Sequence, residues 1–407
     1  MQYRLIPKTG DEISTLGFGA MRLPLKNGKI DRNKAKELIY YAIDNGINFI
    51  DTAYLYGDSE SFLGEILTPE IKSKVKICTK LPSINVRKYE DMENILAEQL
   101  KRLQLDCIDY YLIHAVDLKT INRLLKRDLI KFIDKAKAEG KIKHVGFSYH
   151  GPKEEFEQVV DAYDWDIVMV QYNYFDDNVQ ISAEGIDYAA SKGMGILVME
   201  PLKGGILAGK MPKDAEDIFK KANPDKSNAQ WAMEWVLNNR NITSVLSGMN
   251  SFEQLDDNLD IAEKTTPLSM SFEDMETVEL VKRVMRNSLK INCSTCGYCM
   301  PCPQGVNIPT CMRIYNEKYL FGHKGFINPS LIDYYQYAGG IMGNEGNAGM
   351  CNACGKCLRK CPQKLDIIEE LKKVKKEFEF PGFKYILLFI RKIGFPVYRQ
   401  FIKILNR

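Results

Sequence analysis

The sequence predicts an α/β fold in which an eight-stranded (β/α)8 TIM barrel precedes a smaller, mainly α-helical ferredoxin-like domain rich in cysteine. Between about residues 15 and 265, eight short apolar runs alternate with amphipathic helical stretches. Strict alternation implies right-handed crossovers and a parallel sheet, and eight repeats at this length imply a closed barrel. Eight of the eleven cysteines then fall into two tight runs near the C-terminus.

The expected strands are short, apolar or β-branched runs at 15–19, 48–51, 75–80, 109–114, 144–148, 167–172, 195–200 and 243–247. Amphipathic helices are expected at 32–45, 91–103, 124–139, 153–163, 185–192, 228–238 and 252–262, with a further helix at 273–288. An open, doubly wound sheet is the main alternative. Gly17-Phe18-Gly19 resembles the start of a dinucleotide-binding fingerprint, which such a sheet would carry. However, the third glycine of that fingerprint is absent and the residues that follow do not begin a helix.

Length and charge give the domain organisation and exclude some partners. The 407 residues allow a barrel at 1–270, an iron–sulfur domain at 271–370 and a C-terminal tail at 371–407. The net charge is only +3, from 56 basic and 53 acidic residues, so the overall charge gives no indication of nucleic-acid binding. No segment is apolar enough to span a bilayer, and Met1-Gln2-Tyr3-Arg4 does not resemble a signal peptide. Because free thiols and the oxygen-sensitive clusters argued for next need reducing conditions, we expect a cytoplasmic, anaerobic setting.

The two cysteine runs have the spacing of iron–sulfur ligands. Cysteines separated by two residues wrap a cluster, and a cysteine before proline characteristically completes the neighbouring cluster in two-cluster ferredoxins. Structural zinc takes paired C-x-x-C hooks instead, and disulfides need an oxidising compartment. The sequence therefore predicts two [4Fe–4S] clusters with eight ligands: Cys293, Cys296, Cys299, Cys302, Cys351, Cys354, Cys357 and Cys361.

We expect the two runs to exchange their last cysteines. Cys361 would then complete the cluster of Cys293, Cys296 and Cys299, and Cys302 that of Cys351, Cys354 and Cys357. Only two residues precede Cys302 where the bacterial pattern has three, so the uncrossed assignment stays open. Three further cysteines lie outside the spacing and are expected to be buried small residues: Cys78, Cys107 and Cys311.

The tail from 381 to 407 is basic and amphipathic, with six basic and no acidic residues. Such a segment can lie on an anionic membrane or dock a partner. The alternative, which we favour, is a helix pair broken at Gly394 and Pro396 and packed on the rest of the protein.

Polar side chains follow three consecutive predicted strands. The second strand ends at Asp51 and leads to Tyr56, the third ends at Lys80, and the fourth ends at His114. Any one of these alone is more often a structural residue or a solvated strand end. Chemistry in such barrels sits at the C-terminal ends of the strands, so the four groups can converge there.

The four groups suit the protonation of an oxygen. A tyrosine hydroxyl has a pKa near ~10, too high for ready proton donation at neutral pH, and a nearby ammonium lowers it. Lys80 could do this for Tyr56, while Asp51 holds Lys80 charged and oriented. His114 could hydrogen-bond a substrate carbonyl, which would be reduced by hydride transfer.

Several segments then match one known pattern: Asp51-Thr52-Ala53-x-x-Tyr56-Gly57, Lys80, Leu112-Ile113-His114, Val145-Gly146-Phe147-Ser148, Gln171-Tyr172-Asn173 and Glu200-Pro201-Leu202-x-Gly204-Gly205. With these, residues 1 to about 265 resemble an aldo-keto reductase. The resemblance implies a catalytic tetrad of Asp51, Tyr56 as the acid, Lys80 and His114. The whole chain, over about 15–370, resembles the subgroup of that family with a C-terminal ferredoxin-like domain.

The resemblance also implies an NAD(P)H cofactor. Ser148 and Gln171 match the contacts to the nicotinamide amide, and the pair Asp257 and Asn258 fits the adenine contact. Gly204, Gly205 and Gly248 suit backbone donors to a pyrophosphate. Two positions depart from the family pattern: Met199 stands where many members have a stacking tyrosine, and Gln254 where an arginine would bind a 2′-phosphate. The second departure weakens the case for NADP, and the choice between NAD and NADP stays open.

Nicotinamide gives two electrons as a hydride, whereas a cluster accepts one at a time, and this mismatch leaves three hypotheses. The first is a reductase of a small carbonyl compound whose clusters are structural or regulatory. In the second, an external ferredoxin feeds electrons through the clusters to the barrel, with FMN or a radical substrate step as the link. The third is a non-catalytic electron carrier with a vestigial barrel, against which the filled tetrad argues.

Overall fold

The computed structural model describes residues 1–387 except 210, 326–327, 341–344, 384 and 386. The chain divides into two compact units. The first comprises Met1–Gly209 and Asn223–Glu279, and the second comprises 210–222 and the residues from Leu280 onward. Each unit has a hydrophobic core of its own.

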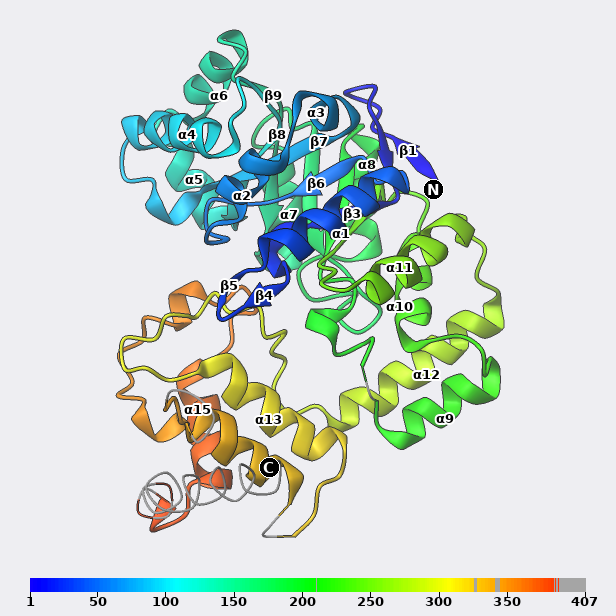
Figure 1. Cartoon of the computed structure of the whole chain (residues 1–407), viewed down its shortest axis with the longest axis vertical. Helices are drawn as coiled ribbons and strands as arrows, with labels where there is room; N and C mark the ends of the chain where they lie inside the picture. Colours follow the sequence, from blue (N-terminus) through cyan, green and yellow to red (C-terminus); the bar gives the residue numbers. More distant parts are fainter. Residues whose placement is uncertain (210, 326–327, 341–344, 384, 386, 388–407) are drawn as a thin grey trace, which may run out of the picture. The chain divides into compact units, whose positions relative to one another are not determined.

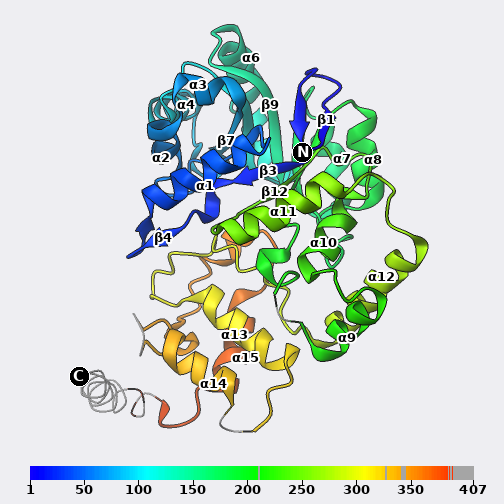
Figure 2. The same cartoon turned by 45° about the vertical axis from the view of Figure 1, so that its right-hand side comes forward.

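Eight parallel strands of the first unit close into a barrel, as Figures 1 and 2 show. Around the barrel they follow the chain order, and they are β3 (Leu16–Gly19), β6 (Phe49–Asp51), β7 (Lys76–Pro82), β8 (Ile108–Val116), β9 (Ile142–Tyr149), β10 (Ile167–Gln171), β11 (Gly195–Met199) and β12 (Ser244–Ser247). All eight predicted strands, and the closed barrel itself, are confirmed.

Helices surround the barrel where amphipathic segments were expected. Those of the first unit are α1 (Arg32–Asp44), α2 (Ser59–Ile66), α3 (Pro69–Lys74), α4 (Tyr89–Leu103), α5 (Leu118–Leu125), α6 (Leu129–Ala138), α7 (Phe156–Val160), α8 (Ala183–Ser191), α10 (Asn228–Leu237) and α11 (Phe252–Lys264). The expected helix at 273–288 is α12 (Phe272–Ser288). In α1, Ala35, Leu38, Ile39 and Ala42 recur at helical spacing and are fully buried.

The prediction of one helix over 124–139 is wrong. The chain forms α5 and α6 there, separated by a turn in which Asp128 adopts a left-handed conformation with φ of 57°. Aspartate tolerates this conformation better than most residues, and one left-handed residue interrupts the helical hydrogen bonds. The predicted helix 153–163 is also shorter than expected, a 3-10 turn (Lys153–Glu155) followed by α7.

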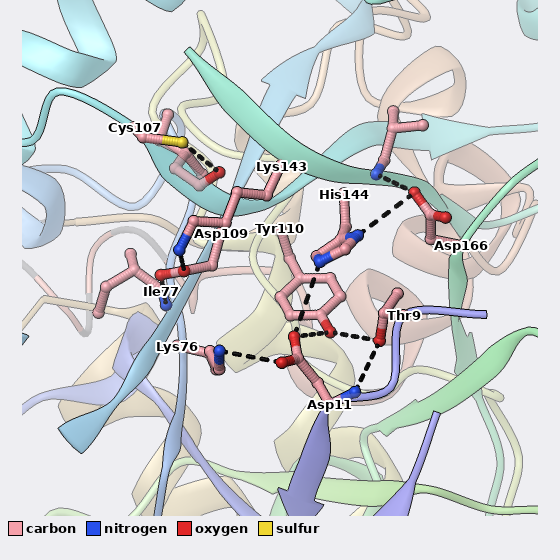
Figure 3. A network of polar contacts seen from close by, with 12 residues as sticks. Thr9, Asp11, Lys76, Ile77, Cys107, Asp109, Tyr110, Lys143, His144 and Asp166 are labelled. Carbon is pink, nitrogen blue, oxygen red and sulfur yellow. Dashed lines mark hydrogen bonds and ion pairs between the residues drawn. The ribbon is translucent and has the colours of Figure 1, made fainter. Parts of the chain in front are cut away.

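An N-terminal hairpin, β1 (Tyr3–Leu5) and β2 (Glu12–Ser14), lies at the start of the strands and was not predicted. Its Ile6 and Ile13 pack against the interior side chains of the barrel. Figure 3 shows the polar network that anchors it: Tyr110 donates to Asp11 Oδ2 at 2.7 Å, and Lys76 lies 3.0 Å from Asp11 Oδ1. The hairpin therefore contributes to the stability of the N-terminal end of the barrel.

The second unit is mainly helical, as predicted. It contains α9 (Lys213–Ala222), α13 (Ile308–Leu320), α14 (Pro329–Asp333), a single π turn (Tyr334–Ala338) and α15 (Ile367–Phe378). Cys311 lies in its core and Cys78 in the barrel, both buried as expected. Cys107 is only half-buried, contrary to our expectation, because it precedes β8 rather than lying within it.

Most of the predicted tail lies outside the described residues. Residues 371–378 belong to α15, whereas the break expected at Gly394 and Pro396 falls beyond residue 387. Among the helices that the structure describes, none has both the length and the apolar composition needed to cross a bilayer.

Two glycine substitutions test how closely helices α2 and α4 pack against each other. A Cβ at Gly64 in α2 would overlap the backbone carbonyl of Arg102 in α4, and backbone cannot move aside as a side chain can. We expect Gly64→Ala to lower the free energy of unfolding by about 1–3 kcal/mol. The three tryptophans, Trp165, Trp231 and Trp235, all lie in the first unit, so urea unfolding followed by tryptophan fluorescence measures it.

Gly185→Ala in α8 is the matched control. There a Cβ would meet only side-chain atoms of Ile181 and Phe156, at 3.0 and 3.4 Å, which can shift. Alanine also favours the helix by about 1 kcal/mol over glycine, so this variant should be neutral or slightly stabilised. Equal destabilisation of the two variants would contradict the proposed close approach of α2 and α4.

Candidate active site and cysteine centres

The four predicted catalytic residues come together at the C-terminal end of three neighbouring strands. Asp51 ends β6, Lys80 lies in β7 and His114 in β8, and these strands pair in that order. Phe49, Cys78 and Leu112 point into the barrel interior. Since side chains alternate along a strand, Asp51, Lys80 and His114, two residues further on, face the same interior.

The Lys80 ammonium is buried and its three N–H donors each have a partner. Its Nζ lies 2.5 Å from Asp51 Oδ1, 2.9 Å from the Thr52 carbonyl oxygen and 3.4 Å from the Tyr56 hydroxyl. Lys80 is 0% exposed and Asp51 only 5%. A buried ion pair is tolerated only when the remaining polar atoms are satisfied, which these contacts achieve for Lys80.

Burial acts on the protonation of Asp51 and His114. Burial raises the pKa of the Asp51 carboxyl, and the Lys80 ammonium opposes this shift. Burial lowers the pKa of His114 well below its ordinary 6.5, and the positive charge of Lys80 acts in the same direction. His114 is therefore a neutral imidazole at neutral pH, able to donate one hydrogen bond without carrying a charge.

Tyr56 lies in the turn after β6 and is the most accessible of the four. It is partly buried, whereas His114 is 2% exposed. Its ring meets the imidazole of His114 edge to face, with the centroids 6.0 Å apart. A phenol beside an ammonium and a neutral imidazole can protonate an oxygen that approaches from the open side.

The residues expected to contact the nicotinamide also face the barrel interior. Ser148 is the penultimate residue of β9 and accepts a hydrogen bond from the backbone N–H of Ala115, the residue after His114, at 2.8 Å. Gln171 ends β10 and is 2% exposed. β9 pairs with β8, the strand of His114, and β10 pairs with β9. Ser148 and Gln171 therefore lie around the same end of the barrel as the tetrad.

The glycines expected at the pyrophosphate lie in the loops after β11 and β12. Gly204 and Gly205 have φ of 68° and 98°, which favours glycine. At Gly248 a Cβ would come within 3.2 Å of the Arg22 side chain. On α11, Asp257 is exposed, whereas Asn258 is buried and donates to Ser247 Oγ at 3.1 Å, so only Asp257 presents its side chain to solvent.

Sequence reasoning missed a buried ion pair behind Gln171. Asp176 accepts from Gln171 Nε2 at 3.0 Å and from Lys203 Nζ at 2.5 Å, and both charged residues are almost fully buried. Asn173 builds the turn, since its Oδ1 accepts from the backbone N–H of Asp176 at 2.9 Å. The Asn-x-x-Asp spacing after a strand is the signal that could have indicated this turn.

Cys361 groups with the first cysteine run. Cys293, Cys296, Cys299 and Cys361 line one small cavity of the second unit. Burial raises the pKa of the Cys299 thiol to about 12, and the neighbouring Cys296, Cys293 and Cys361 add to the shift. Four thiols around one cavity can hold a cluster of iron and sulfide once they lose their protons.

Cys302 groups with the second run. Burial raises the pKa of the Cys357 thiol, and the nearby Cys351 and Cys302 act in the same direction. Cys354 is exposed, so this group lies closer to solvent than the first. Among the described residues, no three His, Cys, Asp or Glu side chains converge as closely as a single metal ion requires.

Comparison with known proteins assigns both parts of the chain. Residues 15–279 match the aldo/keto reductase family, and residues 292–365 match the 4Fe-4S dicluster domain. An L-galactose dehydrogenase from Arabidopsis thaliana is 27% identical over 308 residues, covering 70% of this chain and 96% of the relative. An NADH-specific methylglyoxal reductase from Escherichia coli is 24% identical over 294 residues, covering 61% and 89%.

Solved structures agree with the barrel. An aldo-keto reductase from Bacillus halodurans in its holo form superposes with a TM-score of 0.58 at 22% identity, covering 69% of this chain and 96% of that one. A thermostable aldo-keto reductase in complex with the inhibitor epalrestat superposes with a TM-score of 0.57 at 22% identity, covering 69% and 100%. At this identity the likeness concerns the fold.

The neutral state of His114 gives a pH prediction. In the native protein we expect the imidazole of His114 to stay neutral well below pH 6.5, because its pKa is lowered by burial and by Lys80. In the unfolded chain it takes a proton below about 6.5. The stability that depends on His114 is therefore complete above that pH and is lost as the pH falls.

Nuclear magnetic resonance of histidine-labelled protein measures this, with His114→Gln to assign the signal. The same signal in urea should titrate near the ordinary value. A native midpoint at or above 6.5 would contradict the predicted desolvation.

Proposed function

The chain belongs to the aldo/keto reductase family and carries a 4Fe-4S dicluster domain, and we propose that it is a nicotinamide-dependent carbonyl reductase with Tyr56 as the proton donor. The observation that supports this most is the Lys80 ammonium, which lies 2.5 Å from Asp51 and 3.4 Å from the Tyr56 hydroxyl. An ammonium at that place stabilises the phenolate that remains after proton donation.

Each of the four residues has a distinct task. Tyr56 protonates the carbonyl oxygen as negative charge develops on it. Lys80 stabilises the resulting phenolate, and Asp51 holds Lys80 in place. His114, as a neutral donor, hydrogen-bonds the carbonyl oxygen and orients it toward Tyr56. The bound nicotinamide supplies the hydride.

The cofactor residues fit a nicotinamide dinucleotide. Ser148 and Gln171 would hold the carboxamide, and the positive-φ glycines Gly204 and Gly205 would turn backbone N–H groups toward the pyrophosphate. Gln254 accepts from the Asn250 backbone N–H at 3.1 Å and provides no cation for a 2′-phosphate. This favours NADH, as does the name of the NADH-specific relative. The comparisons lend no support to FMN.

The cysteine geometry supports the crossed assignment of cluster ligands. We propose that Cys293, Cys296, Cys299 and Cys361 hold one [4Fe–4S] cluster, and that Cys351, Cys354, Cys357 and Cys302 hold the other. Bound clusters supply one-electron transfer.

The exposure of Cys354 favours a second candidate function, electron exchange with an external ferredoxin. Lys356, Arg359 and Lys364 are exposed in the same segment and would attract an acidic carrier.

Tyr56→Phe separates the two functions. If the phenol donates the proton, kcat for NADH-dependent reduction of aldehydes such as methylglyoxal should fall by about a hundred to ten thousandfold. Tyr54→Phe is the matched control, because Tyr54 lies in the same turn but its hydroxyl contacts Glu98.

Electron paramagnetic resonance of the anaerobic variants, with dithionite or reduced ferredoxin as donor, follows the clusters independently. A Tyr56→Phe protein with more than about a tenth of the wild-type kcat would contradict the proposed role of Tyr56. Cluster reduction by ferredoxin in all variants, without any carbonyl reduction by the wild type, would favour the second function.

Single cysteine variants test the ligand assignment. If it is correct, Cys302→Ala and Cys351→Ala lose the same cluster, whereas Cys361→Ala and Cys293→Ala lose the other. Each variant should keep about half of the iron, and the resonance spectra of the remaining cluster should match within each pair. Cys311→Ala, at a buried thiol outside both groups, should retain both clusters. A Cys302→Ala spectrum that matches Cys293→Ala would establish the uncrossed assignment instead.

A further inference from the structure

A cleft of about 880 Å³ opens beside Tyr56 in the first unit. Tyr56 is part of its wall. The cleft is also lined by the 3-10 turn after β3 (Ala20–Arg22), by the hairpin of β4 (Leu25–Lys26) and β5 (Lys29–Ile30) and by the start of α1. Residues 57–59 and Asn250, in the loop after β12, complete the lining. Figure 1 labels β4, β5 and α1. None of the residues predicted to act in catalysis or cofactor binding lies in these three segments. Their position beside the proposed proton donor makes the cleft the natural place for the part of a substrate that does not react.

Hydrogen bonds fix the position of the turn at Ala20, one wall of the cleft, relative to the tetrad. Ser59 Oγ donates to the Ala20 carbonyl oxygen at 3.0 Å and lies 2.9 Å from Thr52 Oγ1. The Thr52 carbonyl oxygen in turn accepts from Lys80. A ligand that contacts the turn at Ala20 therefore has a defined position relative to Tyr56.

The cleft is rich in positive charge. Its lining contains four cationic side chains, Arg22, Lys26, Lys29 and Lys34, against two carboxylates. One of these, Asp31, accepts from the backbone N–H of Lys34 and caps α1. Within the part of the chain that the structure describes, none of the four cations forms an ion pair with a carboxylate. Arg22 donates to the Gly204 carbonyl oxygen at 3.1 Å, which orients its side chain.

We propose that this cationic cleft binds an anionic group of the carbonyl substrate, a carboxylate or a phosphate, so that the enzyme prefers acidic carbonyl compounds. The inference rests on the proposed function, because it takes the reacting carbonyl to lie at Tyr56. An excess of four cations over two carboxylates beside the reacting group attracts an anion and discriminates against a neutral analogue of the same shape.

The phosphates of the cofactor are the other source of negative charge. The five residues proposed above for the pyrophosphate and adenine do not belong to the cleft lining among the described residues: Gly204, Gly205, Gly248, Asp257 and Asn258. Lys26 and Lys29 belong instead to the β4–β5 hairpin, which carries none of the proposed cofactor contacts. Arg22 and Asn250 lie nearer the proposed cofactor loops, since Arg22 contacts the Gly204 carbonyl oxygen and Asn250 follows Gly248 in the chain. The place of Lys26 and Lys29 on the hairpin therefore favours the substrate as the source of the anion that these two lysines would bind.

A matched pair of aldehydes tests the proposal: 4-carboxybenzaldehyde and its neutral ester, methyl 4-formylbenzoate. The ester group withdraws electrons more strongly than the carboxylate, so the aldehyde of the ester is intrinsically more reactive toward hydride. A preference of the enzyme for the acid would therefore run against intrinsic reactivity. With NADH and the full-length holoprotein, kcat/KM should be at least about tenfold higher for the acid, and the ratio should fall as salt is added.

The double variant Lys26→Gln/Lys29→Gln should bring the ratio of acid to ester close to one, mainly through the KM for the acid. Lys36→Gln is the control, since Lys36 is exposed on α1 two residues from Lys34 but does not line the cleft. It should retain the preference of the wild type.

Three outcomes would overturn the proposal. One is equal kcat/KM for acid and ester in the wild type. Another is a double variant that keeps the preference. The third is a double variant whose KM rises for NADH rather than for the acid, which would assign the cleft to the cofactor.

If the wild type reduces neither aldehyde, the proposed function fails. The affinity of the protein for the two compounds then tests the anion-binding role of the cleft separately. Calorimetric titration of Tyr56→Phe with each compound should then show about tenfold tighter binding of the acid, whereas equal binding of the two would overturn the inference as well.

Discussion

The buried ion pair of Lys80 and Asp51 is the constraint on which the candidate active site depends. Removing two charges from water costs several kcal/mol for each ion, and only complete pairing offsets that cost. Asp51, Thr52 and Tyr56 supply all three partners of the Lys80 ammonium, and they come from one strand and the turn that follows it. The pairing of β6 with β7 therefore determines where the Tyr56 hydroxyl lies.

The same network extends outward from the site into the helices. Glu60 in α2 accepts from Thr79 Oγ1 and from Gln99 Nε2, both at 2.6 Å, and Gln99 also donates to the Lys80 carbonyl oxygen. All of these groups are buried, so the loss of any of these hydrogen bonds would leave a buried polar group without a partner and destabilise the fold. α2 and α4 are thereby tied to β7, the strand that carries Lys80.

In the second unit, the proposed cluster ligands come from segments that are far apart in the chain. Cys361 shares a cavity with cysteines more than fifty residues earlier, and Cys302 lies near Cys351 and Cys357. A cluster bound to such a set would link the two runs in both directions, and its binding would be coupled to folding. Since α13 and α15 pack together in the core against which these cysteines lie, loss of a ligand would be expected to affect the helices as well.

Local patterns were sufficient for much of this protein. The eight strands, most helices, the four tetrad positions and the cysteine spacing could be predicted because each depends on residues close in the chain or on strand ends that must meet. The break at Asp128, the buried pair of Asp176 and Lys203, and the cationic cleft could not. The sequence by itself determined which side chains are available for chemistry. Which of them share a point, and which are buried deeply enough to lose their ordinary protonation, was decided by strand register and packing, since both depend on residues far apart in the chain.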